Sequence, residues 1–153
     1  MDFLAFSTPA KFTQQSLEKR FGELASKLIK AFEKTHLLYR VPIFSWDESL
    51  TNKLPWKAYL ADPGLNYLLK QEKGKALEHV VFLELIKKGY KVRYYQGTKE
   101  CNFIVYDERP LYAIQVSWEE HPRALAGLEE ATSVLDIPGK LITADNLLTT
   151  SLP

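Results

Sequence analysis

The order of apolar patterns in residues 75–153 constrains the fold of this chain more than any other feature. A broadly apolar stretch over 75–88 predicts a helix that Gly89 ends. Three short runs rich in β-branched and aromatic residues then predict strands at 91–95, 101–106 and 111–118. A helix after Pro122 and a last strand at 140–143 complete an αβββαβ order. This order predicts an α/β fold with a mixed central sheet.

The first half of the chain, residues 1–74, has the pattern of a smaller α+β segment. Apolar residues recur at steps of three and four on one predicted helical face, namely Leu17, Phe21, Leu24, Leu28 and Phe32. Gly22 interrupts this stripe, and a glycine inside a helix costs about 1 kcal/mol, so we expect two short helices joined there. Strand-like runs at 37–44 and 56–61 follow. Two helices followed by a hairpin is the order of a winged helix, and we place the domain boundary between residues 74 and 75.

The charge balance divides at the same place. The chain has 20 Lys+Arg and 19 Asp+Glu, but residues 1–74 hold 11 basic and 8 acidic side chains, and residues 75–153 hold 9 and 11. The 46% hydrophobic content excludes a disordered chain. The single cysteine cannot form an intramolecular disulfide, and no apolar run approaches the roughly 20 residues of a membrane span. We therefore expect a cytoplasmic protein without a membrane partner.

Polar side chains occupy two central strands at positions where a buried strand carries aliphatic residues. Strand alternation places the side chains of Asn102 and Phe103 on opposite faces of their strand, and it places Gln115 and Ser117 together on one face of the next strand. Buried amides and hydroxyls cost stability unless they are hydrogen-bonded. These residues therefore indicate either a mutually satisfied cluster or the remains of a site.

The second half of the chain resembles the PD-(D/E)XK, or restriction endonuclease-like, fold. The residues that carry this resemblance are a helical Glu78, then Lys91-Val92-Arg93-Tyr94-Tyr95, Glu100-Cys101-Asn102-Phe103-Ile104-Val105 and Ala113-Ile114-Gln115-Val116-Ser117. More closely, the chain resembles the C-terminal domain of unknown function behind the ATPase module of a large prokaryotic AAA-type ATPase family. Residues 37–42 and 57–65 resemble the link segment of that family.

This resemblance implies a recognition or regulatory role at the end of an ATPase. The partner would be the ATPase domain of the same or a related chain. The sequence contains no G-x-x-x-x-G-K-[ST] motif, so the chain has no P-loop of its own.

An intact PD-(D/E)XK site needs an Asp and a Glu to hold a divalent cation and a Lys to polarise the attacking water. The resemblance assigns these positions to Asn102, Gln115 and Ser117, which are all uncharged, and only Glu78 keeps its charge. Magnesium favours carboxylates, and neither amide can act as a base. We therefore expect a non-catalytic module without a cofactor. The alternative is a Mg²⁺-dependent endonuclease with a rearranged site, in which Glu78 and Glu100 hold the metal.

The second predicted helix carries a basic face. Lys27, Lys30 and Lys34 lie at spacings of three and four. DNA contact and plain solvation both explain such a face, and with an excess of three positive charges in this half, DNA binding would depend on local patterning. A further hypothesis is a pure protein-interaction domain with no role on nucleic acid.

The remaining candidates carry weaker signals. Three histidines, His36, His79 and His121, are scattered at no metal spacing and are expected to be surface or packed residues. Cys101 is expected to be a small buried hydrophobic residue. Packing is the expectation for both Trp46 and Trp118.

Overall fold

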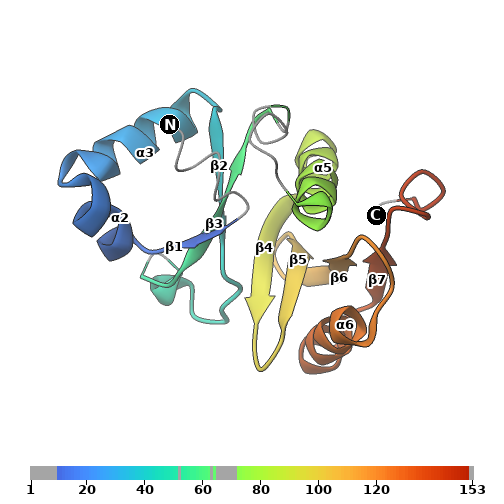
Figure 1. Cartoon of the computed structure of the whole chain (residues 1–153). Coiled ribbons are helices and arrows are strands. Elements are labelled where there is room, and N and C mark those ends of the chain that lie inside the picture. Colours follow the sequence, from blue (N-terminus) through green and yellow to red (C-terminus); the bar gives the residue numbers. More distant parts are fainter. Residues whose placement is uncertain (1–9, 52, 63, 65–71, 152–153) are drawn as a thin grey trace. The chain divides into compact units, whose positions relative to one another are not determined.

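The computed structural model describes residues 10–51, 53–62, 64 and 72–151. The chain forms two compact units, Met1–Gln71 (unit 1) and Glu72–Pro153 (unit 2), which divide three residues before the expected boundary. Each unit contains helices and one sheet, and one of the two sheets is mixed (Figure 1). The chain is therefore of the mixed α/β class. The end of the quoted link segment, at residues 63 and 65, lies outside the described residues.

The described residues of unit 1 combine two α-helices with a small antiparallel sheet. Its elements are β1 (Ala10–Phe12), α2 (Gln14–Phe21), α3 (Leu24–Lys34), β2 (Leu38–Pro42), the short 3-10 helix η1 (Glu48–Leu50) and β3 (Trp56–Leu60). The strands lie in the order β1-β3-β2. Strand β1 was not predicted, because three residues are too few for an alternating pattern to be recognised. The core of the unit consists of Phe12, Leu17, Ala25, Ile29, Leu38, Trp56, Ala58 and Leu60.

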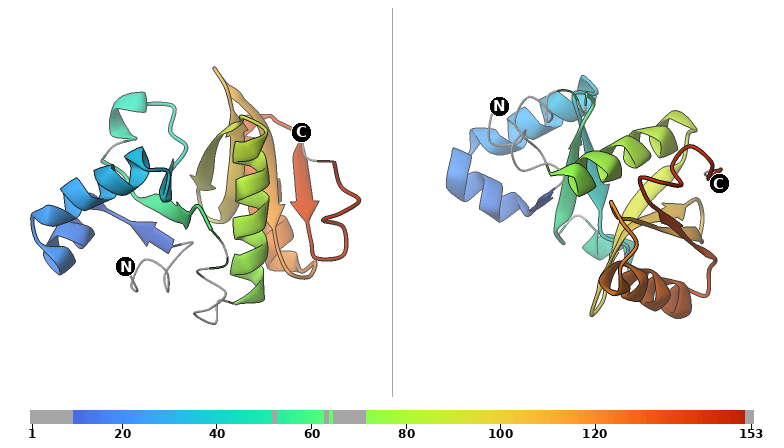
Figure 2. Two further views of the ribbon diagram at one scale, coloured as in Figure 1. Left: turned by 90° about the horizontal axis from the view of Figure 1, so that it is seen from above. Right: turned by 45° about the vertical axis from the view of Figure 1, so that its right-hand side comes forward.

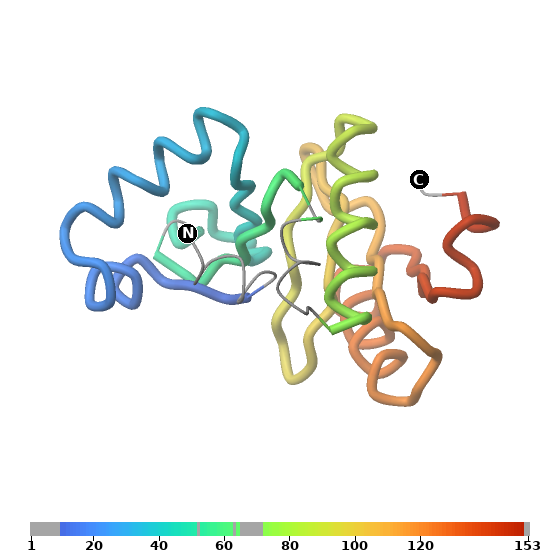
Figure 3. Tube along the Cα trace, turned by 45° about the horizontal axis from the view of Figure 1, so that its top comes forward, coloured from blue at the N-terminus to red at the C-terminus, as the bar shows by residue number. Residues whose placement is uncertain are grey.

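The predicted break between the two helices is confirmed. Thr13 caps the start of α2 and forms a capping box with Ser16. Gly22 ends the helix with a φ of 73°, a conformation that a glycine adopts without strain. Figure 3 shows α2 and α3 as consecutive coils of the trace joined by a tight turn.

The predicted apolar face of α3 is wrong at Leu24 and Leu28, whereas Phe32 packs against the core of the unit as predicted. Ala25 and Ile29 face the core with exposed fractions of 3% and 7%. Leu24 and Leu28 are 64% and 51% exposed, and Phe21 at the end of α2 is 45% exposed. The reason is the break at Gly22, because α3 restarts with its own rotation and a periodicity continued from α2 no longer marks the buried side.

Unit 2 follows the predicted αβββαβ order. Its elements are α5 (Lys73–Lys87), β4 (Lys91–Gln96), β5 (Glu100–Tyr106), β6 (Pro110–Val116), α6 (Pro122–Leu135) and β7 (Gly139–Ile142). The sheet order is β4-β5-β6-β7, antiparallel except for the parallel pair β6 and β7. Strand β6 ends two residues earlier than expected, so Ser117 and Trp118 follow the strand.

The two helices of unit 2 cover opposite faces of its sheet (Figure 2). Helix α5 packs on the face that carries Phe103, whose ring stacks on Phe82 at a centroid distance of 6.1 Å. Helix α6 packs on the other face, where a side chain at Gly127 would overlap the Glu100 carbonyl oxygen. Glycine at this position therefore lets the helix backbone approach the start of β5.

Candidate functional site

Asn102 and Gln115, which we call the amide pair, link β5 to β6 at one end of their ladder. The Asn102 side-chain oxygen accepts a hydrogen bond from the Val116 backbone N–H at 2.8 Å. The Asn102 backbone N–H donates to the Gln115 side-chain oxygen at 3.1 Å. The last regular backbone pair on this side is Phe103 with Ile114. The two amide side chains thus continue the connection between the strands beyond that pair.

The amide pair lies under α6. Asn102 is 6% exposed and Gln115 is half-buried. Alternation from Phe103, which faces α5, assigns both side chains to the α6 face. A side chain added at Gly127 would lie 3.8 Å from the Gln115 side-chain oxygen, so this glycine is a close neighbour of the pair. Two explanations were predicted for these polar residues, a hydrogen-bonded cluster and the remains of a site. The geometry fits the hydrogen-bonded cluster, because both side-chain oxygens accept a backbone N–H.

The other positions of the implied nuclease site do not join the amide pair in a charged cluster. Ser117 follows β6 and is half-buried, and its backbone N–H donates to the Ile142 carbonyl at 3.0 Å. Glu78 belongs to α5, on the opposite face of the sheet, and is half-buried. Glu100 begins β5 and is also half-buried. In the described part of the chain, no group of three or more His, Cys, Asp or Glu residues could hold a metal ion.

The predicted basic face belongs to unit 1. Lys27, Lys30 and Lys34 are all exposed on α3. Leu24 and Leu28 on the same helix are exposed as well. The exposed side of α3 is therefore partly cationic and partly apolar.

Glu130 holds the tip of the β4–β5 hairpin. Its carboxylate accepts hydrogen bonds from the backbone N–H groups of Thr98 at 2.7 Å and Lys99 at 2.9 Å, and from the Tyr95 hydroxyl at 3.2 Å. Burial, together with this carboxylate, raises the pKa of Tyr95 above its ordinary value of 10.0. A side chain at Gly97 would overlap this carboxylate and the Tyr95 hydroxyl, so a larger residue there would require both side chains to move. Glu130 is half-buried because its carboxylate contacts this hairpin, which is distant from it in sequence.

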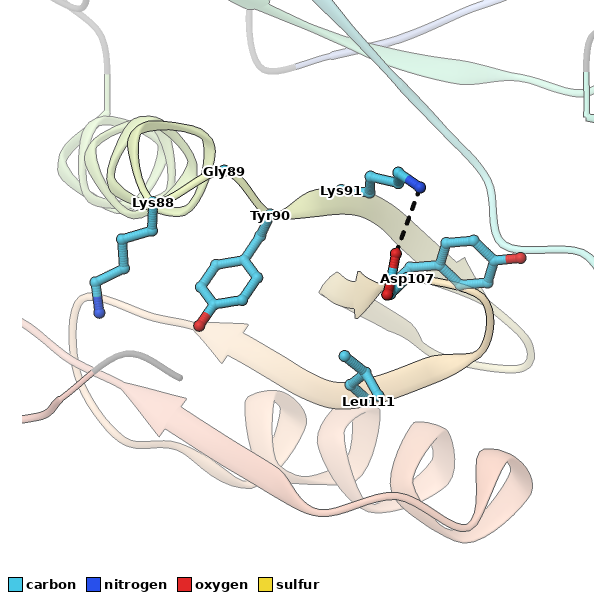
Figure 4. A pocket seen from close by; sticks show the side chains of 7 residues that line it. Lys88, Gly89, Tyr90, Lys91, Asp107 and Leu111 are labelled. Atoms are coloured by element: carbon cyan, nitrogen blue, oxygen red, sulfur yellow. Dashed lines mark hydrogen bonds and ion pairs between the residues drawn. The ribbon is translucent and has the colours of Figure 1, made fainter.

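A cleft of about 290 Å³ opens at the end of the sheet where β5 finishes (Figure 4). It is lined by Lys88, Gly89, Tyr90, Lys91, Tyr106, Asp107 and Leu111. The Lys91 ammonium lies 3.4 Å from the Asp107 carboxylate, and both side chains are about 70% exposed. The volume is at the small end of the range for ligand sites. The cleft contains none of the residues predicted for a site, since the amide pair lies at the other end of β5.

The weaker candidates have structural positions. His79 is fully buried, His36 is exposed with a φ of 54°, and the His121 side-chain Nδ1 caps α6 by accepting the Ala124 N–H at 3.1 Å. Cys101 is fully buried, as predicted.

The two tryptophans depart from the expectation of packing. Trp46 is 72% exposed, and its ring meets the Phe44 ring edge-on with centroids 5.0 Å apart. Trp118 is 40% exposed, and the Lys73 ammonium lies 5.2 Å from its ring centroid.

The comparisons with known proteins identify no relative. Neither a protein-family model, nor a curated protein, nor a solved structure matches the chain. Over the described ranges, no helix has the length and apolar character needed to cross a membrane.

Proposed function

We propose that the chain is a non-catalytic, nuclease-like module that serves as the recognition end of an AAA-type ATPase. The observation that carries this proposal is the amide pair, because neutral side chains stand where the implied nuclease site needs two carboxylates. The αβββαβ order of unit 2, with its parallel last strand pair, supports a restriction endonuclease-like core. The helix–helix–hairpin order of unit 1 supports a winged-helix-like segment.

The hydrogen bonds of the amide pair explain why we propose no catalysis. Metal-dependent phosphodiester hydrolysis needs anionic oxygens that hold the cation and a group that activates water. The oxygens of Asn102 and Gln115 are neutral, and each accepts a backbone N–H. These side chains therefore stabilise the junction of β5 and β6 rather than bind a metal.

A nuclease assay tests this proposal. We expect the chain to cleave neither single- nor double-stranded DNA in the presence of Mg²⁺ or Mn²⁺. Metal-dependent cleavage that Glu78→Ala abolishes, and that the control Glu84→Ala on the exposed side of the same helix leaves intact, would overturn it. The alternative of a rearranged endonuclease predicts Mn²⁺ bound between Glu78 and Glu100, which anomalous diffraction from a soaked crystal would detect.

DNA recognition is a second candidate for the target of the module. It is favoured by one observation, the exposure of all three lysines on the second helix of a helix–turn–helix arrangement. Binding of duplex DNA that weakens steeply with salt and with Lys27→Glu would support it.

A further inference from the structure

Unit 1 exposes a group of large apolar side chains at the junction of its two helices. This group, the leucine face, consists of Phe21, Leu24 and Leu28, which are 45%, 64% and 51% exposed. Leu24 and Leu28 are one helical turn apart, so they lie on the same side of α3. The core side of the helix is already filled by Ala25 and Ile29. Contiguous exposed apolar groups of this kind mark interaction surfaces more often than scattered single ones do.

A lysine stripe borders the leucine face. Lys27 and Lys34 are seven residues apart, close to two helical turns, and each is exposed. In a helical projection Lys27 lies 60° from Leu24, at 100° per residue, so apolar and cationic groups share one continuous exposed surface. Both kinds of group must be matched by any partner that covers this surface.

We infer that this surface of α3 docks an acidic amphipathic helix of a partner protein. The inference rests on the proposed function, since it names the target of the recognition module. Leucines on the partner would cover the leucine face, and flanking Glu or Asp residues would face the lysine stripe, since amphipathic helices bind through an apolar face and charge complementarity sets the choice of partner.

Duplex DNA fits the same surface less well. Protein–DNA contacts are mostly hydrogen bonds to phosphate and sugar, which leucine and phenylalanine cannot make. Solvation alone explains the lysines but leaves Leu24 and Leu28 in water on one side of the helix. A partner that is both apolar and acidic would contact the exposed leucines and the three exposed lysines, which outnumber the one exposed carboxylate among them, Glu23.

The test measures binding of the full chain to two labelled helical peptides by fluorescence anisotropy. Both peptides carry leucines at a heptad spacing, and the remaining positions are Glu in one peptide and Lys in the other. We expect the Glu peptide to bind more tightly. Leu28→Asp is expected to weaken its binding about tenfold or more. The double variant Lys27→Glu/Lys34→Glu is expected to reverse the preference in favour of the Lys peptide.

Matched controls separate this surface from general stickiness. Leu148 is 96% exposed in unit 2, and Leu148→Asp is expected to leave binding of the Glu peptide unchanged. Lys53→Glu, at an exposed lysine outside the helix, is expected to leave the preference unchanged. Circular dichroism of each variant confirms that the fold is retained.

Four results would overturn the inference. They are binding of neither peptide, insensitivity of the binding to Leu28→Asp, self-association of the chain through this face, and duplex DNA binding that depends on the lysines but not on the leucines. None of these results would show that unit 2 binds a metal or cleaves DNA, so each leaves the proposed function standing. Cleavage in the nuclease assay would conversely overturn the proposed function without changing the peptide measurement.

Discussion

The amide pair of unit 2 and the leucine face of unit 1 are opposite departures from the usual distribution of side chains. Asn102 is polar and almost fully buried, and its oxygen accepts the Val116 N–H. Leu24 is apolar and 64% exposed, on the side of α3 away from the core. A buried polar group with a partner belongs to the structure of its own unit. A cluster of exposed apolar groups instead points to a surface that another molecule covers.

The largest expected effect concerns which side of α3 supports the fold. Ile29→Ala removes a core side chain and should lower the free energy of unfolding by about 3 kcal/mol. Leu28→Ala, at the neighbouring position, should change it by less than about 0.5 kcal/mol. Urea unfolding of the two variants measures both values. Equal losses would show that Leu28 is packed and would remove the basis of the leucine face.

The amide pair provides the next effect. Asn102→Leu leaves the buried Val116 N–H without its acceptor and should lower the free energy of unfolding by about 2 kcal/mol. Gln115→Leu should cost less, because this side chain is only half-buried. Chemical denaturation compares the two. A stabilised Asn102→Leu variant would contradict a structural role for Asn102. Binding of another molecule would then be the better explanation of an asparagine at this position.

A substitution at Glu130 tests whether its carboxylate stabilises unit 2, as we expect for the amide pair. Glu130→Ala removes the acceptor of two backbone N–H groups and should cost about 1.5 kcal/mol. Glu129→Ala, at the exposed neighbouring position, is the control.

The same variant should change the titration of Tyr95. Burial and Glu130 raise the pKa of Tyr95 in the folded state. The contribution of neutral Tyr95 to the stability of the fold is therefore fully present below the pKa of the unfolded chain, and it is lost as the pH rises through the pKa of the folded protein. Glu130→Ala should bring the pKa of Tyr95 closer to 10.0, while burial still keeps it raised. Ultraviolet titration of tyrosine ionisation at alkaline pH measures the shift. An unchanged titration would contradict the contact between the two side chains.

The smallest effect concerns the cap of α6. His121→Ala removes the side-chain acceptor of the Ala124 N–H, which keeps its hydrogen bond to the His121 carbonyl, and should cost about 1 kcal/mol or less. His121→Asn supplies another capping oxygen and should restore most of the loss. Thermal unfolding distinguishes the two variants, and equal stability of the alanine and asparagine variants would show that the cap contributes nothing.

Element order was predictable for most of the chain, because it depends on local signals. Strand β5 is a short run rich in β-branched and aromatic residues, and Gly89 and Pro122 mark the end of α5 and the start of α6. Strand β1 escaped prediction because it is short and depends on pairing with β3, which is distant in sequence. The positions of Asn102 and Gln115 in central strands were also predictable, but their hydrogen-bond partners were not.

The sequence by itself determined the type and order of most elements and the absence of charge at the positions that the resemblance assigns to a nuclease site. Only the tertiary structure decided that Ile29 rather than Leu28 is buried, and that Glu130 caps a hairpin rather than facing solvent. The physical reason is one of distance along the chain. Helical and strand periods are properties of neighbouring residues, whereas burial and hydrogen-bond satisfaction depend on segments that only folding brings together.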